Sequence, residues 1–279
     1  MFGKLIKNEF KSTLHSIGFI YVTVAVIIAL FEVAYHINNV NVGRVALVLL
    51  MLTGVVAVVV TFFMVIVQFN KSLYSNQGYL SFTLPVTSGQ LLASKAIVAT
   101  FWMIISWVVS IFAVAVVSIK LSTAIAESEF YGLSLKDILQ MLANMMTEGE
   151  FDVSCLKSLG IVFAIFAFVL VIQLISQLYF AVTLSNTRIM QKLGAFSIVI
   201  VFFVTFIICT ILLGFFMAKL PVGVQINLDG TLKMVTSLTV SGEGIFFVFH
   251  IGGIFFEIVS GALLFVATSM IMDSKVNIK

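Results

Sequence analysis

The residues of this chain that could do chemistry are few and far apart. There are three histidines (His15, His36 and His250) and two cysteines (Cys155 and Cys209). None of these five residues stands at the spacing that metal sites or redox pairs use. The glycine-rich phosphate loop, the zinc-protease helix motif and the serine nucleophile elbow are also missing from the sequence. We therefore expect no enzyme activity and no metal or cofactor bound by this chain.

The overall composition indicates the environment in which this chain folds. Of the 279 residues, 61% are hydrophobic and 10% are charged, with 28 Phe and 2 Pro. Soluble domains carry about 25% charged residues, so this chain has too few polar side chains to cover a water-soluble core. A soluble enzyme, a disordered chain and a nucleic-acid-binding protein are excluded, although the net charge is +3. The composition predicts a polytopic protein of the lipid bilayer.

Six apolar segments are long enough to cross a bilayer, since about 20 residues of helix span about 30 Å of hydrocarbon. They are residues 17–35, 45–69, 96–119, 159–184, 195–217 and 245–272. The segments are continuous apolar runs without a two-residue alternation, which favours helices over a barrel. We predict an all-α membrane protein with six transmembrane helices in a single transmembrane domain, residues 1–279, with longer loops at 120–158 and 218–244.

The distribution of Lys and Arg predicts the orientation. Nine of these residues lie in the two termini and in the loops 70–95 and 185–194, and six lie in the loops on the other side. Because short basic loops stay in the cytoplasm, both termini should be cytoplasmic. On the external side, residues 134–148 have the apolar spacing of an amphipathic helix. In the last external loop, Asp229-Gly230 stands between two strand-like runs and predicts a hairpin.

Polar side chains inside the apolar segments are candidates for function. Gln173, Ser176 and Gln177 follow one another at the spacing of a single helix face, and His250 and Glu257 are seven residues apart. If the last span begins at residue 245, Glu257 lies about 18 Å into it. Such groups line a substrate path, or they are satisfied by neighbouring helices and only hold the bundle together. The sequence leaves both interpretations open.

The cytoplasmic loop 70–95 has the most informative local pattern. Pro85 ends any helix that arrives from the second span, and Thr87 and Gln90 have the spacing of a capping box. A new helix should therefore begin there and continue past Lys95 into the third span.

The part of this loop before Pro85 is rich in aromatic residues. Tyr74, Tyr79 and Phe82 should be exposed on a short cytoplasmic element. Aromatic side chains on such an element are typical of a protein-contact hot spot, but they also anchor turns at lipid headgroups. Composition favours neither interpretation.

The run GYLSFTLPVTSGQLLASK at residues 78–95 resembles the first cytoplasmic loop of the permease subunits of type-2 ATP-binding-cassette exporters. The resemblance is carried by Tyr79, Leu80, Thr83, Leu84, Pro85, Val86, Thr87, Gln90, Leu91, Leu92, Ser94 and Lys95. The opening MFGKLIKNEFKSTL resembles the amphipathic N-terminal elbow helix of the same family. Within that family, the chain is most similar to Gram-positive, Clostridia-like members concerned with export of, or immunity to, peptide antibiotics.

The resemblance implies that the loop is a coupling helix, which sits in a groove of a separate cytoplasmic ATP-binding subunit. Tyr74, Tyr79, Leu80, Phe82 and Lys95 would contact or flank that groove. Two copies of the ATP-binding subunit, carrying the ATP and Mg²⁺, would serve two permeases, identical or related, in a bacterial plasma membrane. The family's short re-entrant external helices before the last span are replaced here by the stretch around Asp229-Gly230.

We therefore expect the permease subunit of an ATP-driven exporter that moves a hydrophobic or amphipathic substrate, such as an antimicrobial peptide or a lipid. Two alternatives remain open. One is a membrane-embedded peptide sensor or immunity protein that does not transport. The other is an ion-coupled transporter that uses Glu257, which is disfavoured because neither proline interrupts a span.

Overall fold

The computed structural model describes residues 2–36, 40–75, 78, 86–126, 153–188, 190–194, 196–227, 231–236 and 245–274. These residues form a mostly helical fold with six long apolar helices able to cross a membrane, which confirms the fold class. The helices pack into two compact units, one of residues 1–135 with 272–279 and one of residues 136–271. That both belong to a single transmembrane domain stays a prediction.

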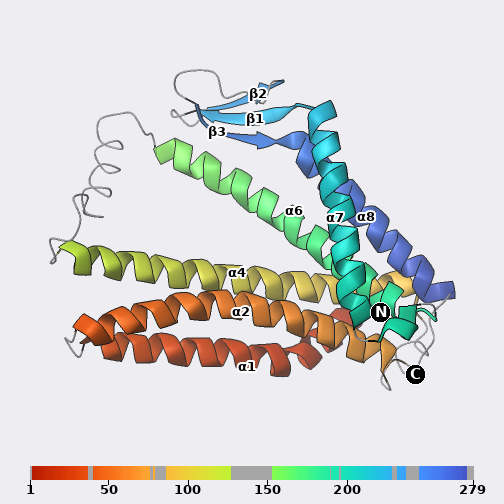
Figure 1. The fold of residues 1–279 in the computed structure, drawn as a ribbon, viewed down its shortest axis with the longest axis horizontal. Helices are drawn as coiled ribbons and strands as arrows, with labels where there is room; N and C mark the ends of the chain where they lie inside the picture. Colours follow the sequence, from red (N-terminus) through yellow and green to blue (C-terminus); the bar gives the residue numbers. More distant parts are fainter. Residues whose placement is uncertain are drawn as a thin grey trace. The chain divides into compact units, whose positions relative to one another are not determined.

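The described residues of the first unit lie mainly in three long helices, α1 (Phe2–His36), α2 (Val40–Tyr74) and α4 (Ser88–Ala126). Figure 1 shows them side by side, and each contacts the other two. Their shared core contains Ile17 and Trp102. The outer faces expose large apolar side chains along most of their length, which is the pattern of helices surrounded by lipid.

The expected elbow helix and the expected first span are one continuous helix, α1. No proline or glycine pair stands between Lys11 and Ile17 to interrupt the helix. The amphipathic N-terminal part of the chain is therefore a direct extension of the first span.

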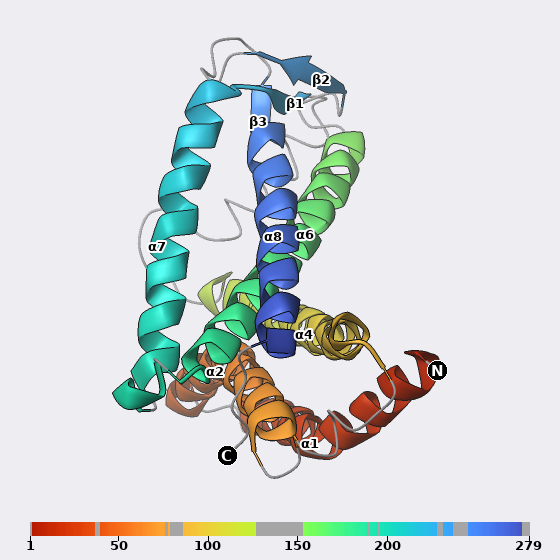
Figure 2. The same ribbon diagram turned by 90° about the vertical axis from the view of Figure 1, so that its right-hand side faces the viewer.

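The second unit contains α6 (Val153–Ser185), the short 3₁₀ helix η1 (Met190–Leu193), α7 (Phe196–Lys219) and α8 (Ile251–Ser274, of which the residues to 271 belong to this unit). Helix α6 packs on α7. The ring of Phe216 in α7 lies 5.7 Å from that of Phe256 in α8. Figure 2 shows the three long helices of this unit.

A three-stranded antiparallel sheet completes the second unit. It consists of β1 (Gly223–Asn227), β2 (Leu232–Val235) and β3 (Ile245–His250) in the order β2-β1-β3. Ile226 and Phe249 of the sheet pack against α6, at the end of the helices where both figures show the strands.

The pairing of β1 with β2 confirms the predicted hairpin, because the backbone N–H of Asn227 donates to the carbonyl of Thr231 across the turn at 3.1 Å. Asp229 and Gly230 themselves lie outside the described residues.

The last span begins at Ile251 instead of residue 245, because residues 245–250 form β3. The run IFFVFH is short, apolar, and rich in aromatic and β-branched residues, so its pattern fits a buried strand as well as a helix. Pairing with β1 gives its backbone groups partners, and the helix begins just before the Gly252-Gly253 pair. The predicted external helix at 134–148 lies outside the described residues.

Candidate functional site

The start of α4 is capped as the sequence predicts. The backbone N–H of Gln90 donates to Thr87 Oγ1 at 3.3 Å, and the N–H of Leu91 donates to the carbonyl of Thr87 at 3.0 Å. Because this side-chain oxygen satisfies one of the free N–H groups of the first turn, the helix begins at Ser88 and continues past Lys95 into the third span. The capped start directly follows the segment that carries Tyr79, Leu80 and Phe82, which lie outside the described residues.

The end of α2 precedes this segment. Tyr74 is buried, 5% exposed, with its ring centroid 6.1 Å from that of Phe69. The expectation that Tyr74 is exposed is therefore wrong. Its ring packs edge-to-face with that of Phe69, five residues earlier in α2.

Gly78 lies close to the backbone at the end of α2. Its N–H donates to the carbonyl of Ser75 at 2.7 Å. A Cβ atom at this position would overlap the carbonyl of Leu73. Glycine is therefore required here, because only a residue without a Cβ allows this close approach to the backbone of Leu73.

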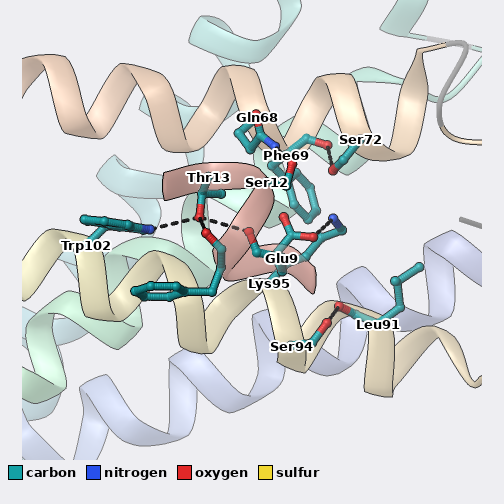
Figure 3. Close-up of polar contacts among 11 residues, drawn as sticks. Glu9, Ser12, Thr13, Gln68, Phe69, Ser72, Leu91, Ser94, Lys95 and Trp102 are labelled. Atoms are coloured by element: carbon teal, nitrogen blue, oxygen red, sulfur yellow. Dashed lines mark hydrogen bonds and ion pairs between the residues drawn. The ribbon is translucent and has the colours of Figure 1, made fainter. Parts of the chain in front are cut away.

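Lys95 forms a buried ion pair with Glu9 of α1. Its Nζ lies 2.7 Å from Glu9 Oε2, and the side chains are 4% and 17% exposed, respectively (Figure 3). The family resemblance implies that Lys95 flanks a partner's groove, which stays a prediction; in the structure its ammonium group contacts the N-terminal helix of its own chain. A buried pair holds its two elements in one register, because removing either charge leaves the other in an apolar environment.

One turn further along, α1 and α4 are joined again. The indole Nε1 of Trp102 donates to Thr13 Oγ1 at 3.0 Å, and the Thr13 hydroxyl lies 2.9 Å from the carbonyl of Glu9. The ring of Phe10 stacks on Trp102 with centroids 5.3 Å apart. On the other side of α1, Gln68 of α2 donates to Ser12 Oγ at 3.0 Å.

A third connection lies deeper in the same unit. The hydroxyl of Tyr21 donates to the backbone carbonyl of Trp102 at 3.0 Å and lies 2.6 Å from Ser106 Oγ. Ser106 in turn donates to Thr61 Oγ1 of α2 at 2.8 Å. Thr61 and Ser106 are fully buried, so these hydrogen bonds satisfy polar groups that lipid could not satisfy.

We call Glu9, Thr13, Tyr21, Thr61, Lys95, Trp102 and Ser106 the interhelical polar network. Except for Lys95, our reading of the sequence did not single them out. A signal was present, however, because Glu9, Thr13 and Tyr21 are spaced by four and eight residues on one face of α1. The network ties the N-terminal half of α4 to α1 and α2.

The polar residues of α6 are also buried. Gln173, Ser176 and Gln177 are each about 5% exposed or less. Neither amide atom of Gln173 has a hydrogen-bond partner among the described residues. Its Oε1 lies 2.6 Å from where a Cβ on Gly261 of α8 would stand, so α6 and α8 approach closely here. Ser176 donates to the carbonyl of Ile172 in its own helix at 3.0 Å.

His250 and Glu257 do not share a helix face. His250 ends β3, opposite Gly223, and its Nδ1 is buried without a partner among the described residues. Glu257 is half-buried, six residues after the start of α8. Its depth from that end is about 9 Å instead of the 18 Å derived for a helix beginning at residue 245.

Comparison of the chain with protein-family models, with curated proteins and with solved structures gave no match. Within the described ranges, no group of three or more His, Cys, Asp or Glu side chains could hold a metal ion. The described residues include six helices that are long and apolar enough to cross a membrane. It is a multi-pass membrane protein. Its buried polar residues in the first unit join neighbouring helices.

Proposed function

We propose that this chain is the permease subunit of an ATP-driven exporter of the type-2 ATP-binding-cassette class. ATP would be hydrolysed by a separate cytoplasmic subunit, in two copies, and a second permease would complete the translocation path. The substrate class is a hydrophobic or amphipathic molecule, such as an antimicrobial peptide or a lipid.

One observation carries this proposal. The segment with Tyr79, Leu80 and Phe82 leads into the capped start of α4, and the first turns of α4 are fixed to α1 by the Glu9–Lys95 pair. A displacement of that segment by a partner would move α4 and α1 together, since packed elements transmit rigid-body movement. A coupling element between an ATP-hydrolysing subunit and a helix bundle needs this rigidity.

The test removes the aromatic contacts of the coupling segment. The double variant Tyr79→Ala with Phe82→Ala should release the ATP-binding subunit from the tagged permease, or separate ATP hydrolysis from transport. Aromatic anchors of an interface contribute about 2 kcal/mol or more each, roughly a thirtyfold change in affinity. Pull-down from native membranes followed by an ATPase assay measures both effects.

The matched control is Phe130→Ala with Tyr131→Ala, two aromatic residues in the loop expected on the external side. This variant should keep the association. If no ATPase co-purifies with the unmutated chain in gentle detergent, the exporter proposal is rejected and the peptide sensor takes its place.

A further inference from the structure

The exposed face of the N-terminal part of α1 carries positive charge only. Lys4, Lys7 and Lys11 are exposed, and their spacing of three and four residues places them on one helix face. Glu9 is the only acidic residue in the sequence from 2 to 30. Its carboxylate is turned to the other face, where it pairs with a lysine of α4. No acidic side chain of this part of α1 therefore offsets the three lysines, which we call the lysine face.

The opposite side of the helix is held in place. Ile6 and Phe10 pack against the core formed with α4, and Thr13 accepts the hydrogen bond from Trp102. The helix therefore cannot turn about its axis without breaking these contacts. The rotation of α1 is fixed, and the lysine face is presented outward.

The length of α1 indicates what the lysine face meets. The helix has 35 residues, about 52 Å at 1.5 Å per residue, whereas the hydrocarbon core takes about 30 Å. Some 15 residues must therefore lie beyond the hydrocarbon. Because charged side chains are costly at membrane depth, the end with Lys4, Lys7 and Lys11 lies outside the hydrocarbon, on the side of the lipid headgroups.

We infer that the lysine face of α1 binds the anionic headgroups of the surrounding bilayer. Ammonium groups attract the phosphates of anionic lipids. Each lysine near the surface raises the affinity of a protein segment for an anionic membrane by about fivefold. The ion pair with Lys95 contributes by removing Glu9 from this face. This lipid site is independent of any transport activity and of an ATP-binding partner.

The test uses the full-length protein in bilayers of phosphatidylcholine mixed with phosphatidylglycerol. Spin-labelled phosphatidylglycerol and spin-labelled phosphatidylcholine measure the preference of the protein for the anionic lipid. The unmutated chain should prefer phosphatidylglycerol, and the preference should fall as salt screens the charges. The variant K4Q/K7Q/K11Q should lose most of this preference at low salt.

The matched control K157Q/K219Q/K233Q removes three exposed lysines from the second unit and should keep the preference. The charge-preserving variant K4R/K7R/K11R should also keep it. In a Trp107→Phe background, emission from Trp102 reports whether α1 remains packed on α4 in each variant. A preference that persists in K4Q/K7Q/K11Q, resists high salt, or disappears equally in the control would overturn the inference. Loss of an ATPase partner without loss of lipid preference would assign the face to a protein instead, and would also overturn it.

Discussion

At the scale of single residues, the Glu9–Lys95 pair joins α1 to α4 in a buried position. Glu9→Gln removes the carboxylate partner of an ammonium group that is only 4% exposed. The free energy of unfolding should fall by about 3 kcal/mol or more. Lys95→Met should lower the free energy of unfolding by less, because the remaining Glu9 side chain is 17% exposed and can be hydrated. Chemical denaturation in detergent measures both values. A greater loss of stability in Lys95→Met than in Glu9→Gln would contradict the finding that Lys95 is the more buried of the two side chains.

Gly78 offers a second prediction at the same scale. Gly78→Ala places a methyl group against the backbone carbonyl of Leu73, which cannot move without unwinding the end of α2. Overpacking of this kind costs about 1–3 kcal/mol, and proteolysis of the following segment should become faster. Gly160→Ala is the matched control, since nothing lies within 4 Å of the added atom. Equal stability of the two variants would mean that the backbone at Gly78 does not lie so close to the carbonyl of Leu73.

At the scale of elements, the close approach of α6 and α8 can be tested through Gln173. Its amide is buried without a partner among the described residues, and an unsatisfied amide costs about 1–3 kcal/mol. Gln173→Leu should therefore raise the melting temperature in detergent. A lower melting temperature would show that the amide has a partner elsewhere. Unchanged stability combined with lost transport would favour the substrate-path interpretation over helix packing.

At the scale of the whole molecule, the charge distribution predicts that both termini are cytoplasmic. Cys155, in the first turn of α6, should then react with an impermeant thiol reagent on intact cells, whereas Cys209, within α7, should not. A cysteine introduced as Ser274→Cys, at the end of α8, should react only after permeabilisation. Labelling of that cysteine in intact cells would reverse the orientation.

Several features of the fold and the candidate site follow from the sequence by itself. The six spans follow because each depends only on a continuous apolar run that is long enough for the hydrocarbon. The capped start of α4 and the β1–β2 hairpin follow because both depend on residues a few positions apart. In each case the interacting groups are neighbours along the chain, so local spacing determines the structure.

Only the tertiary structure decided the remaining features. The Glu9–Lys95 pair and the Tyr21–Ser106 contact join residues 86 and 85 positions apart, and polar residues on one helix face do not specify which helix they meet. The run IFFVFH becomes β3 because β1 supplies hydrogen-bond partners for its backbone, and that shortens the last helix and moves Glu257 nearer its end. The physical reason is common to all three: the free energy of a buried polar group depends on its partner, and the partner is supplied by packing.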